Sequence, residues 1–290
     1  MSLTHPEPSV SVGKGLSQRP RDGGTAVSVP IITLTTDFGT SDHLVAAMKG
    51  VILGINPGAH LVDIHHHVVP YDVLDGALTI GSVYPYFPLR TIHIVIVDPG
   101  VGTARRPLLV AADNQYFIAP DNGVLSMVYD RDPNAVVRHV TASHNFLEPV
   151  SPTFHGRDIF APIAAYLSKA WQTESFGDEI TDFTRFAFPK PKAAGDSLKA
   201  VVLRVDAFGN LMTNLRAEDL PEATVATGKI NLQVGAKRVE RFVATFGEGN
   251  NGEPVALIGS SGFLEIAVNK GHASKALGSN RGAEVTLVKS

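Results

Sequence analysis

The chain contains no cysteine among its 290 residues. A protein without thiols forms no disulfide, uses no thiolate nucleophile and binds no zinc ion or iron–sulfur cluster through sulfur. Catalysis and metal binding that depend on cysteine are therefore excluded. Because disulfides are typical of oxidising compartments, this composition suits a cytoplasmic protein, and we expect that localisation.

A strong net charge and a long apolar run are also missing. The 25 Lys and Arg against 28 Asp and Glu leave a formal net charge of -3. Nucleic acids and anionic membrane surfaces attract clustered positive charge, so neither is expected as a partner. No apolar run approaches the roughly 20 residues that cross a bilayer. A small molecule is the partner class that remains.

The residues that are present divide the chain into two domains, which its length allows. Residues 1–29 are rich in Ser, Gly, Pro and Arg, lack the apolar stretch of a signal peptide and are expected to form a disordered leader. Strand-like and helix-like segments alternate over 30–187, which predicts an α/β domain with a mainly parallel central sheet. Residues 188–196 include two prolines and are interpreted as a linker. Short strand-like segments over 197–290 predict a C-terminal antiparallel β-barrel domain.

The apolar pattern also places individual elements. The helices expected in the N-terminal domain cover 41–58, 71–87, about 123–130 and 157–170. Its expected strands cover 31–36, 60–68 and 91–97, followed by a hairpin over 107–123. The strands expected in the C-terminal domain cover 198–206, 228–235, 241–247, 253–259, 263–269 and 283–289.

Polar residues follow three of the N-terminal strands. Asp37 follows the first, Tyr71 and Asp72 the second, and Asp98 the third. Ligands of an open parallel sheet bind outside the carboxyl ends of its strands, so these residues are expected to line one crevice. A single Asp at such a place can also cap a turn, but its recurrence after three strands favours a site.

Two loops combine charged residues with glycine. The stretch "VDPGVGTARRP" (97–107) places Arg105 seven residues after Asp98, and its glycine spacing does not complete a dinucleotide-binding fingerprint. His155 precedes Gly156 and Asp158 at a helix start, where backbone N–H groups favour an anion. Alternatively, Asp158 stabilises the first turn of this helix and His155 packs against the protein.

The run "HHH" at 65–67 suggests a metal site at first sight. Alternate residues of a strand face opposite sides, so only His65 and His67 could share a metal ion. No H-E-x-x-H motif or nearby carboxylate completes the ligand set. We therefore expect no metal.

The C-terminal domain supplies a second group of polar and aromatic residues. Two stretches, "VDAFGNLMTN" (205–214) and "IGSSGFLEIAVN" (258–269), combine them with turn residues, and both could be ordinary turns. A Phe in the strand-like segment between them can stack on a ligand or belong to the core. The candidate ligand contacts are Asp206, Phe208, Asn210, Phe246, Ser260 and Ser261.

Six segments together resemble one enzyme family. In chain order they are "TTDFGTSDHLVAAMKG", "VPYDVLDGA", "VDPGVGTARRPLLV", "FHGRDIFAP", "VDAFGNLMTN" and "GSSGFLEIAVN". They are similar to the S-adenosylmethionine (SAM) hydroxide adenosyltransferases, adenosine-forming SAM hydrolases homologous to fluorinases and chlorinases. The resemblance, from about residue 31 to the C-terminus, implies an α/β domain and a β-barrel. It also implies a homotrimer with sites between subunits and a reaction without a cofactor, since SAM is the substrate.

The resemblance implies catalytic roles for three residues. Asp98, Arg105 and His155 match a hydrolase triad in which the Arg follows the Asp by seven residues. In fluorinases a Tyr stands at the position of Asp98, and a halide-contacting Ser stands at the position of Gly156. The chain therefore departs from the halogenases where a halide would be held.

The same resemblance implies contacts with the adenosine part of SAM. Asp37 matches an Asp that binds both ribose hydroxyls, and Tyr71 matches an aromatic residue beside the ligand. Asn210 matches an adenine-binding Asn, and Phe246 matches an adenine-stacking aromatic residue.

At the methionine end of SAM, Asp206 and Ser260 match residues that hold the amino acid. Ser261 stands where the fluorinase has an Arg, and Val268 stands near a second such Arg. Adenine contacts in this region are therefore expected from the backbone.

The expected reaction is attack of water or hydroxide on C5′ of SAM, giving adenosine and L-methionine. The thioether leaving group needs no proton. Asp98 could remove a proton from water, or Arg105, which would weaken that base, could hold a hydroxide. Both remain open, as do a chlorinase-like halogenase and a protein that binds SAM or adenosine without rapid turnover.

Overall fold

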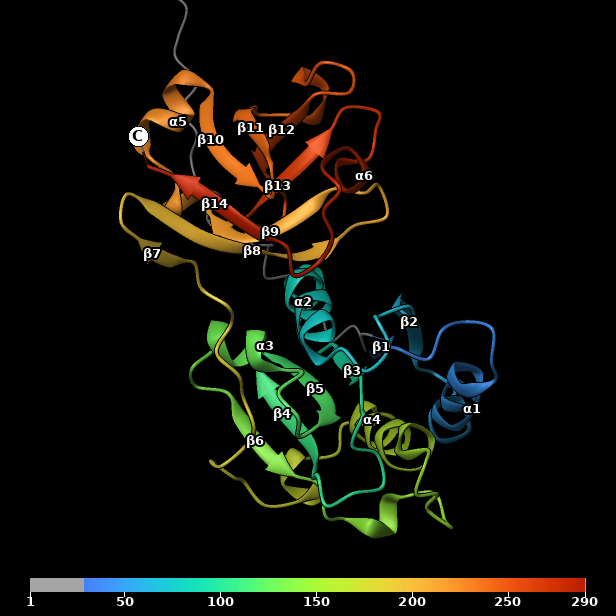
Figure 1. The fold of residues 1–290 in the computed structure, drawn as a ribbon. Coiled ribbons are helices and arrows are strands. Elements are labelled where there is room, and N and C mark those ends of the chain that lie inside the picture. Colours follow the sequence, from blue (N-terminus) through green and yellow to red (C-terminus); the bar gives the residue numbers. More distant parts are fainter. Residues whose placement is uncertain (1–28, 290) are drawn as a thin grey trace, which may run out of the picture.

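The computed structural model describes residues 29–289 (Figure 1). The leader expected at 1–29 lies outside these residues except for Val29. Elements of the N-terminal part are β1 (Ile31–Thr36), α1 (Leu44–Ile55), β2 (His60–His65), α2 (Val73–Val83), β3 (Ile92–Ile96), β4 (Pro107–Ala112), β5 (Gln115–Pro120), α3 (Ser126–Arg131), β6 (Val136–His139) and α4 (Ala161–Ser168). Those of the C-terminal part are β7 (Lys192–Ala194), β8 (Ser197–Val205), β9 (Leu211–Arg216), α5 (Glu222–Thr227), β10 (Lys229–Val234), β11 (Lys237–Arg241), β12 (Pro254–Ile258), β13 (Phe263–Val268), α6 (Ala273–Leu277) and β14 (Glu284–Val288).

The N-terminal sheet has the strand order β2-β1-β3-β5-β4-β6. The pairs β1/β2, β1/β3 and β3/β5 are parallel, whereas β4 runs antiparallel to β5 and β6. The expected α/β domain with a mainly parallel sheet is thus confirmed. The parallel strands place their carboxyl ends at one edge of the sheet, where the loops after β1 and β3 begin.

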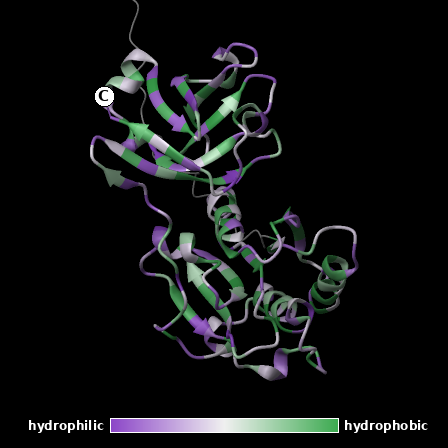
Figure 2. Ribbon diagram, in the orientation of Figure 1, coloured by the Kyte–Doolittle hydropathy of each residue, from purple (hydrophilic) through white to green (hydrophobic). Residues whose placement is uncertain are grey.

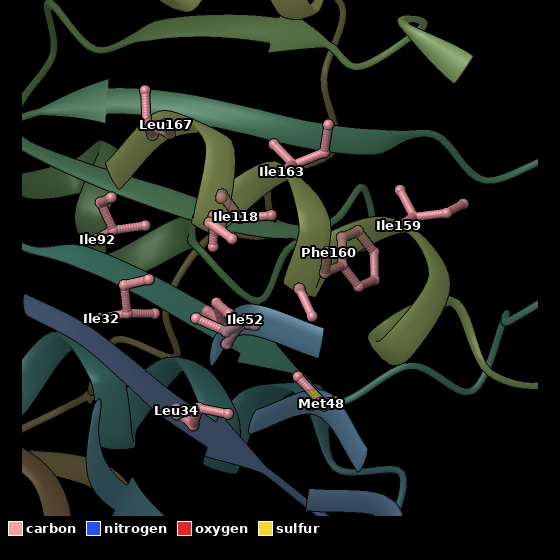
Figure 3. Close-up of a cluster of buried hydrophobic side chains, with 14 of the residues drawn as sticks. Ile32, Leu34, Met48, Ile52, Ile92, Ile118, Ile159, Phe160, Ile163 and Leu167 are labelled. Atoms are coloured by element: carbon pink, nitrogen blue, oxygen red, sulfur yellow. The ribbon is translucent and has the colours of Figure 1, made fainter. Parts of the chain in front are cut away.

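Helices bury both faces of this sheet, which explains why every residue of β3 is buried. On one face, Met48 and Ile52 of α1 and Ile163 of α4 pack over Ile32 and Ile92 (Figure 3). On the other face, α2 and α3 cover the sheet. Two-sided burial accounts for the nearly continuous apolar strands of the sequence.

The C-terminal sheet has the order β11-β10-β14-β8-β9-β13-β12, and its neighbours are antiparallel. A bridge between Phe242 and Ala256 brings its two edges together, so the sheet is nearly closed and barrel-shaped. Hydrophilic and hydrophobic residues alternate along β10 (Figure 2), as expected for a strand with one face in the core. The predicted C-terminal antiparallel barrel is confirmed.

Several local elements differ from the sequence-based expectation. The strand expected at 241–247 is wrong, because β11 ends at Arg241. Glu248 accepts hydrogen bonds from the Ala244 N–H and the Thr245 hydroxyl, and these contacts fold the following residues into a turn. Strands β6 and β9 were not predicted, and β7 lies within the segment interpreted as a linker and pairs with β8.

The helix expected at 157–170 begins with a π-helical turn, Gly156–Phe160, which continues into α4. Pro162 has no N–H to donate to the carbonyl of Asp158, and that carbonyl instead accepts the N–H of Leu147 at 2.8 Å. The wider turn, in which the Ala161 N–H reaches the carbonyl of Gly156, thus lies directly before a position that has lost one helical hydrogen bond. Across residues 29–289, no helix is both long and apolar enough to cross a membrane.

Candidate active site

A pocket of about 380 Å³ lies at the carboxyl ends of β1 and β3. Its lining includes Asp37, Tyr71, Asp98 and His155, four of the residues expected to bind or act on the ligand. The parallel arrangement of β1 and β3 brings the first three together, since their loops leave the same edge of the sheet. The structure thus collects these residues in one pocket, while their roles remain predictions.

Asp98, Arg105 and His155 form one connected cluster. Arg105 donates two hydrogen bonds to Asp98, from Nε to Oδ1 at 3.0 Å and from Nη2 to Oδ2 at 2.5 Å. The same Nη2 lies 2.8 Å from Nδ1 of His155. The loop after β3 therefore turns its Arg back onto its own Asp, and His155 joins them from the loop before α4.

Gly102 is the residue that lets these two loops approach each other. Its φ of +76° belongs to the left-handed region, and a Cβ atom here would lie 2.1 Å from the carbonyl oxygen of Pro152. Pro152 belongs to the loop that carries His155. A side chain at position 102 would push the loops apart, so glycine is required by both conformation and contact.

The cluster is almost closed to solvent. The side chains of Asp98 and Arg105 are only 4% and 8% exposed, and the guanidinium lies 5.3 Å from the ring centre of Phe160. Arg105 Nη1 is buried and has no hydrogen-bond partner in the described structure. An unused donor on a buried cation is a position where an anion or water would be bound.

His155 is held as a neutral acceptor. A guanidinium can only donate, so Nδ1 of His155 accepts and its proton belongs on Nε2. Burial and the positive charge of Arg105 lower the pKa of His155 below 6.5, with Asp98 and Asp158 acting in the opposite direction. The neutral imidazole is therefore the form that fits this cluster.

Asp37 and Tyr71, which also line this pocket, are joined by a hydrogen bond. Oδ2 of Asp37 accepts the backbone N–H of Tyr71 at 2.9 Å. Burial raises the pKa of Asp37, the hydrogen bond from Tyr71 lowers it, and the charge of Asp98 raises it further, for a net rise. Tyr71 has a φ of +66°, rare outside glycine, and the residue is 74% exposed. The strained turn leaves the aromatic ring open to a ligand.

A second pocket, of about 700 Å³, lies in the C-terminal domain. Its lining includes five of the expected ligand contacts: Asp206, Phe208, Asn210, Phe246 and Ser260. Asp206 organises their loop, because Oδ1 accepts the N–H groups of Phe208 and Asn210 and Oδ2 accepts the side-chain amide of Asn210. Phe208 and Phe246 keep much of their surface exposed. This pocket shares no lining residue with the pocket of Asp98.

Two residues near this pocket differ from the sequence-based expectation. Ser261 is absent from the lining of this pocket, and its hydroxyl is buried without a hydrogen-bond partner among the described residues. Glu265, which was not predicted, lines the pocket instead, and burial and then the charge of Asp206 raise its pKa. A signal was present, since Glu265 is the one charged residue of the apolar strand "FLEIAV".

The other sequence features have structural explanations. Asp158 is fully buried, binds the guanidinium of Arg157 through both oxygens and accepts the N–H of Ser151. It therefore stabilises the helix start, whereas His155 reaches the pocket. The ring centres of His65 and His67 lie 6.1 Å apart, and over residues 29–289 no group of three His, Asp or Glu residues is arranged to hold a metal ion.

Comparisons with known proteins find relatives that are similar over most of the chain. The (R)-S-adenosyl-L-methionine hydrolase of Salinispora tropica is 36% identical over 264 residues, covering 86% of this chain and 94% of the relative. The fluorinase of an Actinoplanes species is 31% identical over 292 residues, covering 90% and 98%. The crystal structure of an uncharacterized conserved protein from Thermotoga maritima superposes with a TM-score of 0.84 at 36% identity, covering 89% and 99%.

Family-level similarity extends over both domains. The sequence model of the SAM hydroxide adenosyltransferase N-terminal domain matches residues 32–177, and that of the C-terminal domain matches residues 200–286. These ranges contain most of the two sheets and all lining residues of both pockets. The chain belongs to the SAM hydroxide adenosyltransferase family.

Proposed function

We propose that this protein hydrolyses SAM to adenosine and L-methionine by attack of water or hydroxide on C5′. The observation that carries the proposal is the buried cluster of Asp98, Arg105 and His155, of which Asp98 and His155 line the N-terminal pocket. The hydrolase relatives support it, and the fluorinase relatives are less similar in sequence. A small, partly apolar pocket also suits a nucleoside-sized ligand.

The geometry favours a bound hydroxide over a carboxylate base. Both oxygens of Asp98 are already engaged by Arg105, so its function here is to orient the guanidinium. The free Nη1 of Arg105 offers a positive donor to the nucleophile. When hydroxide attacks, the C5′–O bond forms and the electron pair of the C5′–S bond stays on sulfur. The two opposite charges disappear together, and a dry pocket favours that change.

Substrate contacts are proposed for both pockets. Asp37 has one oxygen available beyond its bond to Tyr71 and would accept both ribose hydroxyls, with the Tyr71 ring against the ligand. In the C-terminal pocket, Asn210 and Phe246 would bind adenine. Adenine and the methionine end of SAM would also be enclosed by Phe208, Asp206, Ser260 and the loop of Ser261.

We also propose a homotrimer in which the N-terminal pocket of one subunit faces the C-terminal pocket of its neighbour. The support is that the expected contacts fall into two pockets with no common residue. Co-expressed Asp98→Ala and Asn210→Ala chains test this arrangement. Random mixing would restore about a quarter of the sites, because intact halves then meet across subunits. Activity no higher than that of either variant alone would contradict a shared site.

The reaction is tested by incubating the purified protein with SAM in oxygen-18 water. We expect adenosine labelled at the 5′ hydroxyl, together with methionine. The proposal fails if the label is absent, if chloride diverts the product to 5′-chloro-5′-deoxyadenosine, or if intact SAM remains bound without hydrolysis. Asp98→Ala should abolish turnover while SAM still binds. The expectations of a cytoplasmic localisation and of no cofactor remain predictions.

A further inference from the structure

The middle residue of the triple-histidine motif has a different environment from its neighbours. His66 is 5% exposed, whereas His65 and His67 are exposed. Its Nδ1 lies 2.9 Å from the hydroxyl of Thr36, the residue directly before Asp37. The motif therefore places one buried imidazole behind the loop that carries a proposed substrate contact.

His66 is the centre of a chain of polar groups that ends at this loop. Its Nε2 lies 3.0 Å from Oδ1 of Asp63, close enough for an ion pair, although the two atoms form no hydrogen bond in the described structure. Asp63 in turn forms an ion pair with Lys49 at 2.6 Å. Burial raises the pKa of Asp63, but the contacts with Lys49 and His66 lower it, so that the net change is downward and the carboxylate is ionised.

The directions of these hydrogen bonds are consistent. The Thr36 hydroxyl oxygen accepts the N–H of Phe38 at 3.3 Å, which leaves the hydroxyl hydrogen free for Nδ1 of His66. His66 then carries its proton on Nε2, facing Asp63. The backbone adds two more ties, from the Gly39 N–H to the His66 carbonyl at 2.6 Å and from the Val68 N–H to the Thr36 carbonyl at 3.3 Å.

The arrangement of Thr, His and Asp is not a second catalytic triad. Thr36 is 0% exposed, so its hydroxyl cannot reach a ligand. The side chain of Asp37, the next residue, lines the pocket and is free to accept from a ligand through one oxygen. This chain of polar groups therefore affects the position of Asp37, and Asp37 is the residue that contacts the ligand.

We propose that His66 is a positioning residue that fixes the loop 36–39 so that the Asp37 carboxylate meets the ribose hydroxyls. This inference rests on the proposed function, because it assumes an adenosine-containing ligand. The loop has glycine at 39, with a φ of +71°, and no other side chain in the described structure bonds to the Thr36 hydroxyl. Without His66 the loop loses the contact that orients Thr36, and Asp37 loses its fixed position.

The test compares His66→Gln with His65→Gln and His67→Gln, which change the exposed neighbours in the same motif. We expect His66→Gln to raise KM for SAM and Kd for adenosine about tenfold, as for the loss of one buried hydrogen bond. Its kcat should stay within about twofold, because the Asp98 cluster is untouched. The two neighbouring variants should match the wild type.

Thr36→Val keeps the side-chain volume and removes the hydroxyl that bonds to His66. It therefore tests the same contact if His66→Gln does not fold. It should reproduce the higher KM and Kd, and Thr36→Ser should restore wild-type values. Adenosine affinity is measured by calorimetry on the full chain. Unchanged affinity in both His66→Gln and Thr36→Val, or equal losses in all three His variants, would overturn the inference. A wild-type protein that neither binds adenosine nor hydrolyses SAM would instead refute the proposed function.

Discussion

Arg105 connects Asp98 and His155, two residues that line the N-terminal pocket, and the shape of its guanidinium group is essential for this. Two nitrogens bind Asp98, one of them also reaches His155, and Nη1 remains free. A lysine has one ammonium group and cannot occupy all these positions. We expect Arg105→Lys to lower kcat at least about a hundredfold, comparable with the loss of a preorganised donor. Rate measurements at saturating SAM test this, and a kcat within a few-fold of wild type would contradict the hydroxide-holding role.

The pH dependence of kcat/KM is also determined by single residues of the N-terminal pocket. His155 must be neutral to accept from Arg105, and its pKa lies below the ordinary 6.5 because of burial and the Arg105 charge. Asp37 must be ionised, and burial raises its pKa above 3.8. As the pH falls, His155 gains a proton and can no longer accept from Arg105, and Asp37 gains a proton and loses its charge. The value of kcat/KM should therefore decrease on the acid side between about pH 6.5 and 3.8.

Replacing the imidazole separates the two groups. In His155→Gln only Asp37 of this pair remains to titrate, so the acid limb should fall with the slope of one ionisation instead of two, on a reduced plateau. An acid limb in the wild type with its midpoint above 6.5, or one whose slope His155→Gln leaves unchanged, would contradict this assignment.

At the scale of elements, the loop after β3 depends on Gly102. An alanine there meets the Pro152 carbonyl and an unfavourable positive φ. We expect Gly102→Ala to reduce kcat more than about tenfold, since a small displacement of catalytic groups has a large effect. Gly50→Ala in α1 is the matched control, because nothing lies within 4 Å of its Cβ position. Equal activity of both variants would show that the close approach of the two loops is unimportant for catalysis.

The type of a strand or helix was predictable where the spacing of its apolar residues matches the face that is buried. The strand predicted at 31–36 and the helix predicted from the apolar stripe through Met48 and Ile52 have the correct type and nearly the correct bounds. In both, the position of a side chain on the strand or helix decides whether it is buried. The residues after Arg241 were mispredicted, since Glu248 bonds to backbone groups that no periodicity reveals. Likewise, whether the expected contacts of the two domains line one pocket or two depends on how the domains pack, which a linear pattern does not contain.

At the scale of the whole molecule, two arginines of the C-terminal domain hold the start of α2. Arg204 donates to Oδ1 of Asp75 at 2.6 Å, to its carbonyl at 2.8 Å and to the Thr79 hydroxyl at 2.5 Å. Arg281 pairs with Asp72, which also caps α2. Asp72 directly follows Tyr71, so the packing of the two domains and the shape of the first pocket are connected.

Removal of Arg204 should therefore weaken the domain interface more than an ordinary surface change. The side chain of Asp75 is only 6% exposed, and in Arg204→Met its charge would stay buried without that partner. We expect a loss of about 3–5 kcal/mol in the free energy of unfolding, typical for one partner of a buried ion pair. Lys199→Gln removes an exposed pair with Glu284 and should cost about 1 kcal/mol or less. Denaturant unfolding of both variants decides the matter: similar small losses would show that the pair with Asp75 does not hold the two domains together.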